Sequence, residues 1–139
     1  MLHTVGPVWR DGAHDEPALL ANCYWRSLRL AEQMGRHSVA FPAISCGMYG
    51  YPLHQAARIA VAETTAWQRA HAVPKRVILV AYGDAAYKAY QAAAAATPSG
   101  VSAHLAAERI VYDCCIGACH RFPSAGSGAM TESWAWRVP

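Results

Sequence analysis

The residues best placed to do chemistry lie between Phe41 and Pro52, where the chain reads Phe-Pro-Ala-Ile-Ser-Cys-Gly-Met-Tyr-Gly-Tyr-Pro. This segment joins an apolar stretch to an expected helix through a turn that contains Gly47 and Gly50. Glycines allow positive φ and a close approach of a ligand, and a helix N-terminus adds unpaired N–H groups and a partial positive charge. The turn is therefore suited to an anion, and phosphate is the natural ligand.

Three other motifs resemble this segment, but the residues that each requires at fixed spacing are absent here. A phosphatase-type cysteine loop needs an arginine six positions after Cys46, where Pro52 stands. A nucleophile elbow needs glycines two residues either side of the nucleophile, where Ile44 and Met48 stand. A nucleoside-triphosphate P-loop needs Lys-Ser or Lys-Thr after the glycines, and neither follows. A nearby helix N-terminus favours a lowered thiol pKa, but we expect Cys46 to be a small filler rather than a nucleophile.

Three strand–helix units are expected to position this turn. The expected strands are 1–5, 38–44 and 76–81, and the expected helices are 15–34, 53–70 and 84–96. Asp15 and Asp84 are the expected helix N-caps, and Gly35 is the expected left-handed residue after the first helix. Alternating strands and helices predict a parallel sheet, with ligands beyond the carboxyl ends of its strands. Tyr82 follows the third strand directly, so its ring is expected at that edge, where it can stack on a base.

Composition excludes several classes of function. The 139 residues are 54% apolar and 15% charged, which indicates one globular domain with a real core. The sequence shows neither an apolar run of about 18 residues nor a secretory signal, so no membrane association is predicted. The net charge of +3 comes from scattered basic residues, which makes nucleic acid an unlikely partner. Five cysteines form an odd number, and we interpret them as reduced thiols in the cytoplasm.

Several separate blocks of the chain resemble the second half of a macro domain. These blocks are Leu2–Trp9, Leu19–Tyr24 with Ser27 and Leu28, and Ala40–Pro52 with Ala56 and Ala57. The resemblance covers roughly residues 1–96, and the most similar branch is the bacterial one that acts on O-acetyl-ADP-ribose and ADP-ribosylated proteins. It implies a three-layer α/β/α fold with a mostly parallel sheet, from which the family's N-terminal strands are missing here. It also implies binding of ADP-ribose without a metal or another cofactor.

The resemblance implies which residues bind the ligand. The backbone of the turn is implied to hold the diphosphate, and its residues are Ser45, Cys46, Gly47, Met48, Tyr49 and Gly50. Tyr49 is implied to pack beside the distal ribose, and Tyr82 is implied to lie on the adenine side. The family's catalytic motifs, an Asn-Ala-Ala-Asn block and a glycine-rich loop with an acidic residue, would precede Met1. No catalytic residue is therefore assigned.

Other titratable residues near the turn match no motif. Asp11, Asp15 and Glu16 are expected to be solvated loop or helix-cap carboxylates. His3 lies on an expected apolar strand, where a histidine is usually a satisfied structural group, so it is left out of the site.

Two classes of function stay open. The first is a hydrolase of O-acetyl-ADP-ribose or of protein ADP-ribosyl esters, here truncated. The second is a non-catalytic ADP-ribose-binding module or an inactive gene fragment. Residues 1–96 are expected to form a partial macro domain, and residues 97–139 an unmatched, poorly ordered tail. Within that tail the cysteines and histidine lack the two separated pairs of a structural zinc site, so no metal is assigned; they are Cys114, Cys115, Cys119 and His120.

Overall fold

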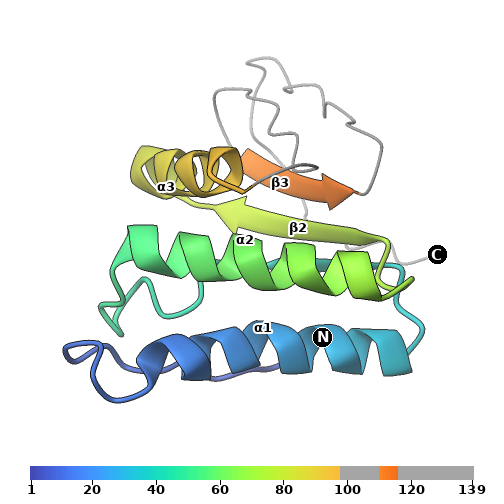
Figure 1. Ribbon diagram of the computed structural model, residues 1–139, viewed down its shortest axis with the longest axis horizontal. Helices are drawn as coiled ribbons and strands as arrows, with labels where there is room; N and C mark the ends of the chain where they lie inside the picture. The colour runs from blue at the N-terminus through green and yellow to red at the C-terminus, as the bar shows by residue number, and fades with distance from the viewer. Residues whose placement is uncertain (98–109, 116–139) are drawn as a thin grey trace, which may run out of the picture.

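The computed structural model of the protein describes residues 1–97 and the backbone of residues 110–115. Its elements are α1 (Glu16–Gln33), β1 (Ser38–Phe41), α2 (Leu53–Ala70), β2 (Arg76–Ala81), α3 (Gly83–Ala95) and β3 (Ile110–Cys115). Figure 1 shows α2 lying along α1, with β2 passing next to α2 and leading into α3. Strands and helices alternate through α3, which confirms the expected α/β class.

The described strands form one sheet with the order β1-β2-β3. β1 and β2 pair in parallel, from Ser38 opposite Arg76 to Phe41 opposite Leu79. β3 pairs with the other edge of β2 in the antiparallel sense. This third strand comes from the part of the chain beyond residue 96, so at least six residues of the unmatched segment contribute to the sheet. The expected domain boundary itself stays a prediction.

The structure corrects three expected boundaries. Residues 1–9 form neither helix nor strand, because a strand needs a hydrogen-bonded neighbour and no described strand pairs with them. The strand expected at 38–44 ends at Phe41, since Pro42 has no N–H to donate. Neither expected side-chain cap forms: Asp15 is left-handed with φ 58° and caps nothing, and α3 begins at Gly83, before Asp84.

The core lies where the apolar faces of α1 and α2 meet the sheet. Tyr24 packs edge-on against Phe41 of β1, with ring centroids 5.1 Å apart. The fully buried large side chains include Leu20, Tyr24, Leu28, Val61, Trp67, Val77, Leu79 and Tyr90. Met34 is exposed because α1 has already ended there. Gly35 follows with φ 63°, as expected for a left-handed helix end. Among the described helices, none has the length and apolar character needed to cross a bilayer.

An aromatic cluster joins the carboxyl-terminal ends of α1 and α2. The Trp67 ring stacks on His71 with centroids 3.7 Å apart and an angle of 4° between the ring planes. Trp25 of α1 meets Trp67 edge-on at 5.2 Å. His71 Nδ1 lies 3.1 Å from Glu32 Oε1, and Trp67 Nε1 donates a hydrogen bond to the Val73 carbonyl at 3.0 Å. These contacts hold the two helices together at the edge of the sheet where β2 begins.

The core packing yields a first prediction. We expect Leu28→Ala to lower the free energy of unfolding by about 2–5 kcal/mol, because it removes a fully buried side chain and leaves a cavity. Leu30→Ala is the matched control on the same helix, since Leu30 is 45% exposed, and its effect should stay within about 1 kcal/mol. Urea unfolding of both variants is the measurement. Equal losses would contradict the described α1–α2 packing.

Candidate functional site

The turn between β1 and α2 reverses the chain at two positions with positive φ. Gly50 has φ 64°, as the sequence predicts. The second such residue is Ser45, also with φ 64°, whereas Gly47, which could adopt positive φ, does not. The reversal thus occurs directly after Ile44, where the N-terminal segment passes close by: a Cβ on Gly6 would overlap the Ser45 side chain. Glycine at position 6 permits this approach.

The turn forms internal hydrogen bonds but leaves several of its N–H groups without a described acceptor. Its three internal backbone bonds run from Cys46 N–H to Ala43 O at 3.2 Å, from Gly50 N–H to Gly47 O at 3.0 Å and from Tyr51 N–H to Ser45 O at 3.0 Å. The consecutive N–H groups of Gly47, Met48 and Tyr49 have no acceptor among the described residues. In the first turn of α2, no side chain caps the N–H groups of Leu53 and His54. Five main-chain donors are thus left between Gly47 and His54, as an anion site at a helix N-terminus requires.

The parallel topology brings Tyr82 to the same edge of the sheet as this turn. β1 and β2 run side by side in parallel, so the segments that follow them emerge at one edge. Figure 1 shows the connection into α2 and the start of α3 at the same end of the molecule. Tyr82 and Met48 are almost fully exposed, and Tyr49 is 40% exposed. The three side chains are therefore accessible to a ligand at this edge.

Cys46 is held as a neutral thiol. Burial raises the pKa of its thiol to about 11, so the lowered pKa that a helix N-terminus favours does not occur. The Sγ atom donates to the Ile44 carbonyl at 3.4 Å and packs against the core. The expected role of a small filler therefore fits the structure, and a thiolate nucleophile does not.

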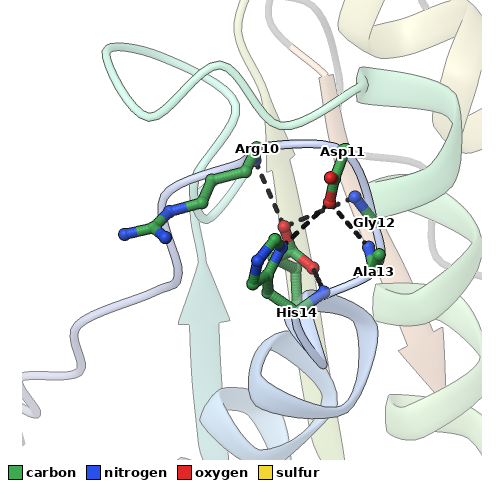
Figure 2. A network of polar contacts seen from close by, with 6 residues as sticks. Arg10, Asp11, Gly12, Ala13 and His14 are labelled. Atoms are coloured by element: carbon green, nitrogen blue, oxygen red, sulfur yellow. Dashed lines mark hydrogen bonds and ion pairs between the residues drawn. The ribbon is translucent and has the colours of Figure 1, made fainter.

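Glu16 is the functional candidate that the sequence missed. It was expected to be a solvated cap, yet its side chain is 2% exposed. Its carboxylate accepts hydrogen bonds from the backbone N–H groups of Arg10 at 3.2 Å, Gly12 at 3.4 Å and His14 at 2.7 Å. Figure 2 shows these N–H groups converging on one carboxylate, and the Asp11 carboxylate facing the Ala13 N–H at 2.9 Å and His14 Nδ1 at 3.0 Å within the same loop. Desolvation alone would raise the pKa of Glu16, but the N–H donors outweigh it and lower that pKa to about 2.

The loop held by Glu16 contacts the turn between β1 and α2 through Trp9. The Trp9 N–H donates to the Tyr49 carbonyl at 2.8 Å. The Trp9 ring lies 4.7 Å from the buried Tyr51 ring at an interplanar angle of 58°. Burial, followed by the charge of Glu16, raises the pKa of Tyr51, which keeps its hydroxyl neutral. Residues 9–16 and residues 45–51 thus form one continuous packed unit.

No metal is assigned within the described residues. The ligand atoms of Asp11, His14 and Glu16 lie within 4.8 Å of one another. However, the N–H groups already occupy the Glu16 oxygens, and His14 Nδ1 pairs with Asp11 Oδ1 at 3.0 Å. Of the cysteine–histidine group near the end of the chain, Cys119 and His120 lie outside the described residues. His3 is exposed and takes no part in the turn.

Comparisons with known proteins point to one family. Residues 1–60 match the family model of the macro domain. A macro domain-containing protein of Xanthomonas axonopodis pv. citri (strain 306) is 74% identical over 95 residues, which are 68% of this chain and 53% of that protein. A protein of Escherichia fergusonii named O-acetyl-ADP-ribose deacetylase is 49% identical over 84 residues, which are 60% of this chain and 48% of that protein.

A solved structure supports the same assignment. The Oceanobacillus iheyensis macrodomain with ADP has a TM-score of 0.62 and 38% sequence identity to this chain, over 66% of this chain and 47% of the other. The chain spans about half the length of the curated relatives that it matches.

The buried carboxylate yields a prediction for acid unfolding. Because the pKa of Glu16 is about 2 in the folded chain and 4.5 in its ordinary state, its contribution to stability is complete above pH 4.5. That contribution is lost as the pH falls from 4.5 towards 2. We expect Glu16→Gln to flatten the fall in urea midpoint over this window. Asp84→Asn, which removes an exposed carboxylate, is the control; equal slopes for the wild type and Glu16→Gln would contradict the prediction.

Proposed function

The amino-terminal part of this chain belongs to the macro-domain family, and we propose that the turn from Ser45 to Gly50 binds the diphosphate of ADP-ribose. The observation that carries the proposal is the run of acceptor-free N–H groups at Gly47, Met48 and Tyr49, placed directly before the N-terminus of α2. A diphosphate supplies the negative charge and the acceptor oxygens that such donors lack. The ADP in a related solved structure carries the same group.

In this proposal the rest of the nucleotide follows the edge of the sheet. Tyr49 leaves the turn with a partly exposed ring and packs beside the distal ribose. Tyr82 presents its exposed ring beyond β2 and lies on the adenine side, where a base can stack on it. Cys46 contributes its main chain, since its thiol is neutral and packed against the core.

We propose binding rather than hydrolysis as the activity of the described residues. Hydrolysis needs a group that activates water near the distal ribose. Cys46 is neutral, the Glu16 carboxylate is buried and accepts three backbone hydrogen bonds, and His3 is exposed. The ligands proposed are ADP-ribose, O-acetyl-ADP-ribose and ADP-ribosylated proteins, bound in the cytoplasm by a unit of residues 1–96. A hydrolase like the named deacetylase is the alternative.

Calorimetric titration tests the ligand. We expect ADP-ribose to bind and adenosine, which lacks the diphosphate, to bind at least about tenfold more weakly, since charge-assisted hydrogen bonds to the turn would be lost. Incubation with O-acetyl-ADP-ribose should give binding without release of acetate. Equal affinity for adenosine and ADP-ribose would overturn the diphosphate assignment, and turnover would favour the hydrolase.

A pair of glycines offers a matched test of the turn. Gly50 and Gly35 have φ of 64° and 63°, and an added Cβ meets nothing within 4 Å at either position. Gly50→Ala and Gly35→Ala should therefore each cost about 1–2 kcal/mol of stability through the same backbone strain. Only Gly50→Ala should weaken ADP-ribose binding, by about tenfold, because only Gly50 shapes the turn.

The outcome is read by titration of both variants at a temperature where both are folded. Equal losses of affinity would show that strain acts globally, and unchanged affinity in Gly50→Ala would place the ligand elsewhere. Gly47→Val adds a distinction, since Gly47 has no positive φ and open space around it. A loss of affinity without a loss of stability in that variant indicates that the ligand itself fills the space beside Gly47.

A further inference from the structure

The buried carboxylate of Glu16 organises the loop at residues 10–14, to which the exposed Asp11 carboxylate adds contacts with the Ala13 N–H at 2.9 Å and with His14 Nδ1 at 3.0 Å. Residues 10–14 form neither helix nor strand, and three of their N–H groups point at the Glu16 oxygens (Figure 2). The shortest of these bonds, from His14 N–H, is 2.7 Å long, as expected for a charge-assisted hydrogen bond. A buried carboxylate with three donors therefore fixes the path of the chain between Trp9 and α1.

This loop in turn restrains Trp9. A Cβ on Gly12 would lie 2.8 Å from the Cη2 atom of the Trp9 ring, so the loop folds back directly over the indole. The main chain of Arg10, the next residue after Trp9, is bonded to Glu16. The position of Trp9 is consequently set from both its ring and its backbone.

Trp9 is also the contact to the turn proposed to bind the diphosphate. Its N–H donates to the Tyr49 carbonyl at 2.8 Å, and its ring packs on Tyr51. These two residues lie directly around Gly50, whose positive φ shapes the turn. A displaced Trp9 would release the Tyr49 carbonyl, and the Tyr49 peptide would become free to rotate. Its orientation matters because the open N–H groups at 47–49 belong to the same short run of peptides.

We propose that Glu16 is a positioning residue for the diphosphate turn and acts on it through Trp9. The proposal rests on the proposed function for the effect on affinity, but the effect on the free turn is independent of any ligand. Glu16 does not touch the ligand in this scheme. It holds the 10–14 loop, the loop holds Trp9, and Trp9 holds the Tyr49 and Tyr51 side of the turn.

Affinity measurements test whether Glu16 acts on the turn through Trp9, a chain of contacts called the relay below. Glu16→Gln replaces one acceptor oxygen by an amide NH₂ that faces backbone donors, and Trp9→Ala removes the ring contacts. Each should weaken ADP-ribose binding by about tenfold, and the double variant should lose no more than the larger single loss, because both changes break one chain of contacts. Asp11→Asn is the control in the same loop, since its side chain is exposed and asparagine keeps the Oδ1 acceptor for the Ala13 N–H, and its affinity should stay within about twofold.

Amide hydrogen exchange without ligand supplies the readout that a general loss of stability would not move. In Glu16→Gln the Trp9 N–H should exchange at least about tenfold faster, whereas the Arg36 N–H, bonded to the Ala31 carbonyl at the other end of α1, should keep its rate. Equal acceleration at both amides indicates a merely structural role and overturns the proposal. If Glu16→Gln does not fold, Glu16→Asp, which withdraws the charge by one methylene, is measured in the same way.

The two readouts separate the possible failures. If the wild type does not bind ADP-ribose, the proposed function fails, while selective exchange at Trp9 still supports the positioning role. If the wild type binds and Glu16→Gln keeps its affinity within twofold, the positioning role is wrong and the proposed function stands. Additive losses in the double variant would likewise overturn the relay through Trp9.

Discussion

Main-chain N–H groups that need an acceptor determine the structure of the loops at the end of the molecule where α1 and α2 begin. Two neighbouring loops gather such donors, at 10–14 and at 47–49. The chain fills the first with its own carboxylate, Glu16, and leaves the second open to solvent. The Glu16 carboxylate is buried and would be costly to leave without donors, so this carboxylate and the first loop depend on each other. The second loop is exposed, and water can satisfy it until a ligand takes its place.

The turn proposed to bind the diphosphate offers N–H dipoles rather than charged side chains. Residues 45–50 contain no lysine or arginine. Burial keeps Cys46 and Tyr51 neutral, and the nearby Glu16 charge is compensated by three N–H dipoles. Recognition in such a site depends on geometry, because N–H groups are directional and their positions follow the backbone. This is why the proposed tests rely on φ and on backbone contacts instead of on charge reversal.

The regular elements were predictable from the sequence, and the contacts between loops were not. The helix Leu53–Ala70 and the strand Arg76–Ala81 have the predicted bounds, since their apolar periodicity is strong and Pro74 and the glycine turn delimit them. The strand expected at residues 1–5 failed because pairing is a property of two segments, which one segment cannot reveal. Glu16 was misread because a carboxylate in a first helical turn usually faces water. Its burial depends on how residues 10–14 fold back, for which the sequence carries no periodic signal.

The aromatic cluster of Trp25, Trp67 and His71 makes one end of the helix pair more firmly packed than the other. At the carboxyl-terminal ends of α1 and α2, the aromatic rings and the contact between His71 and Glu32 hold the two helices together. The opposite end consists of short connections whose shape is maintained by a few polar contacts. The loops at that end can therefore shift without disturbing the aromatic contacts between α1 and α2.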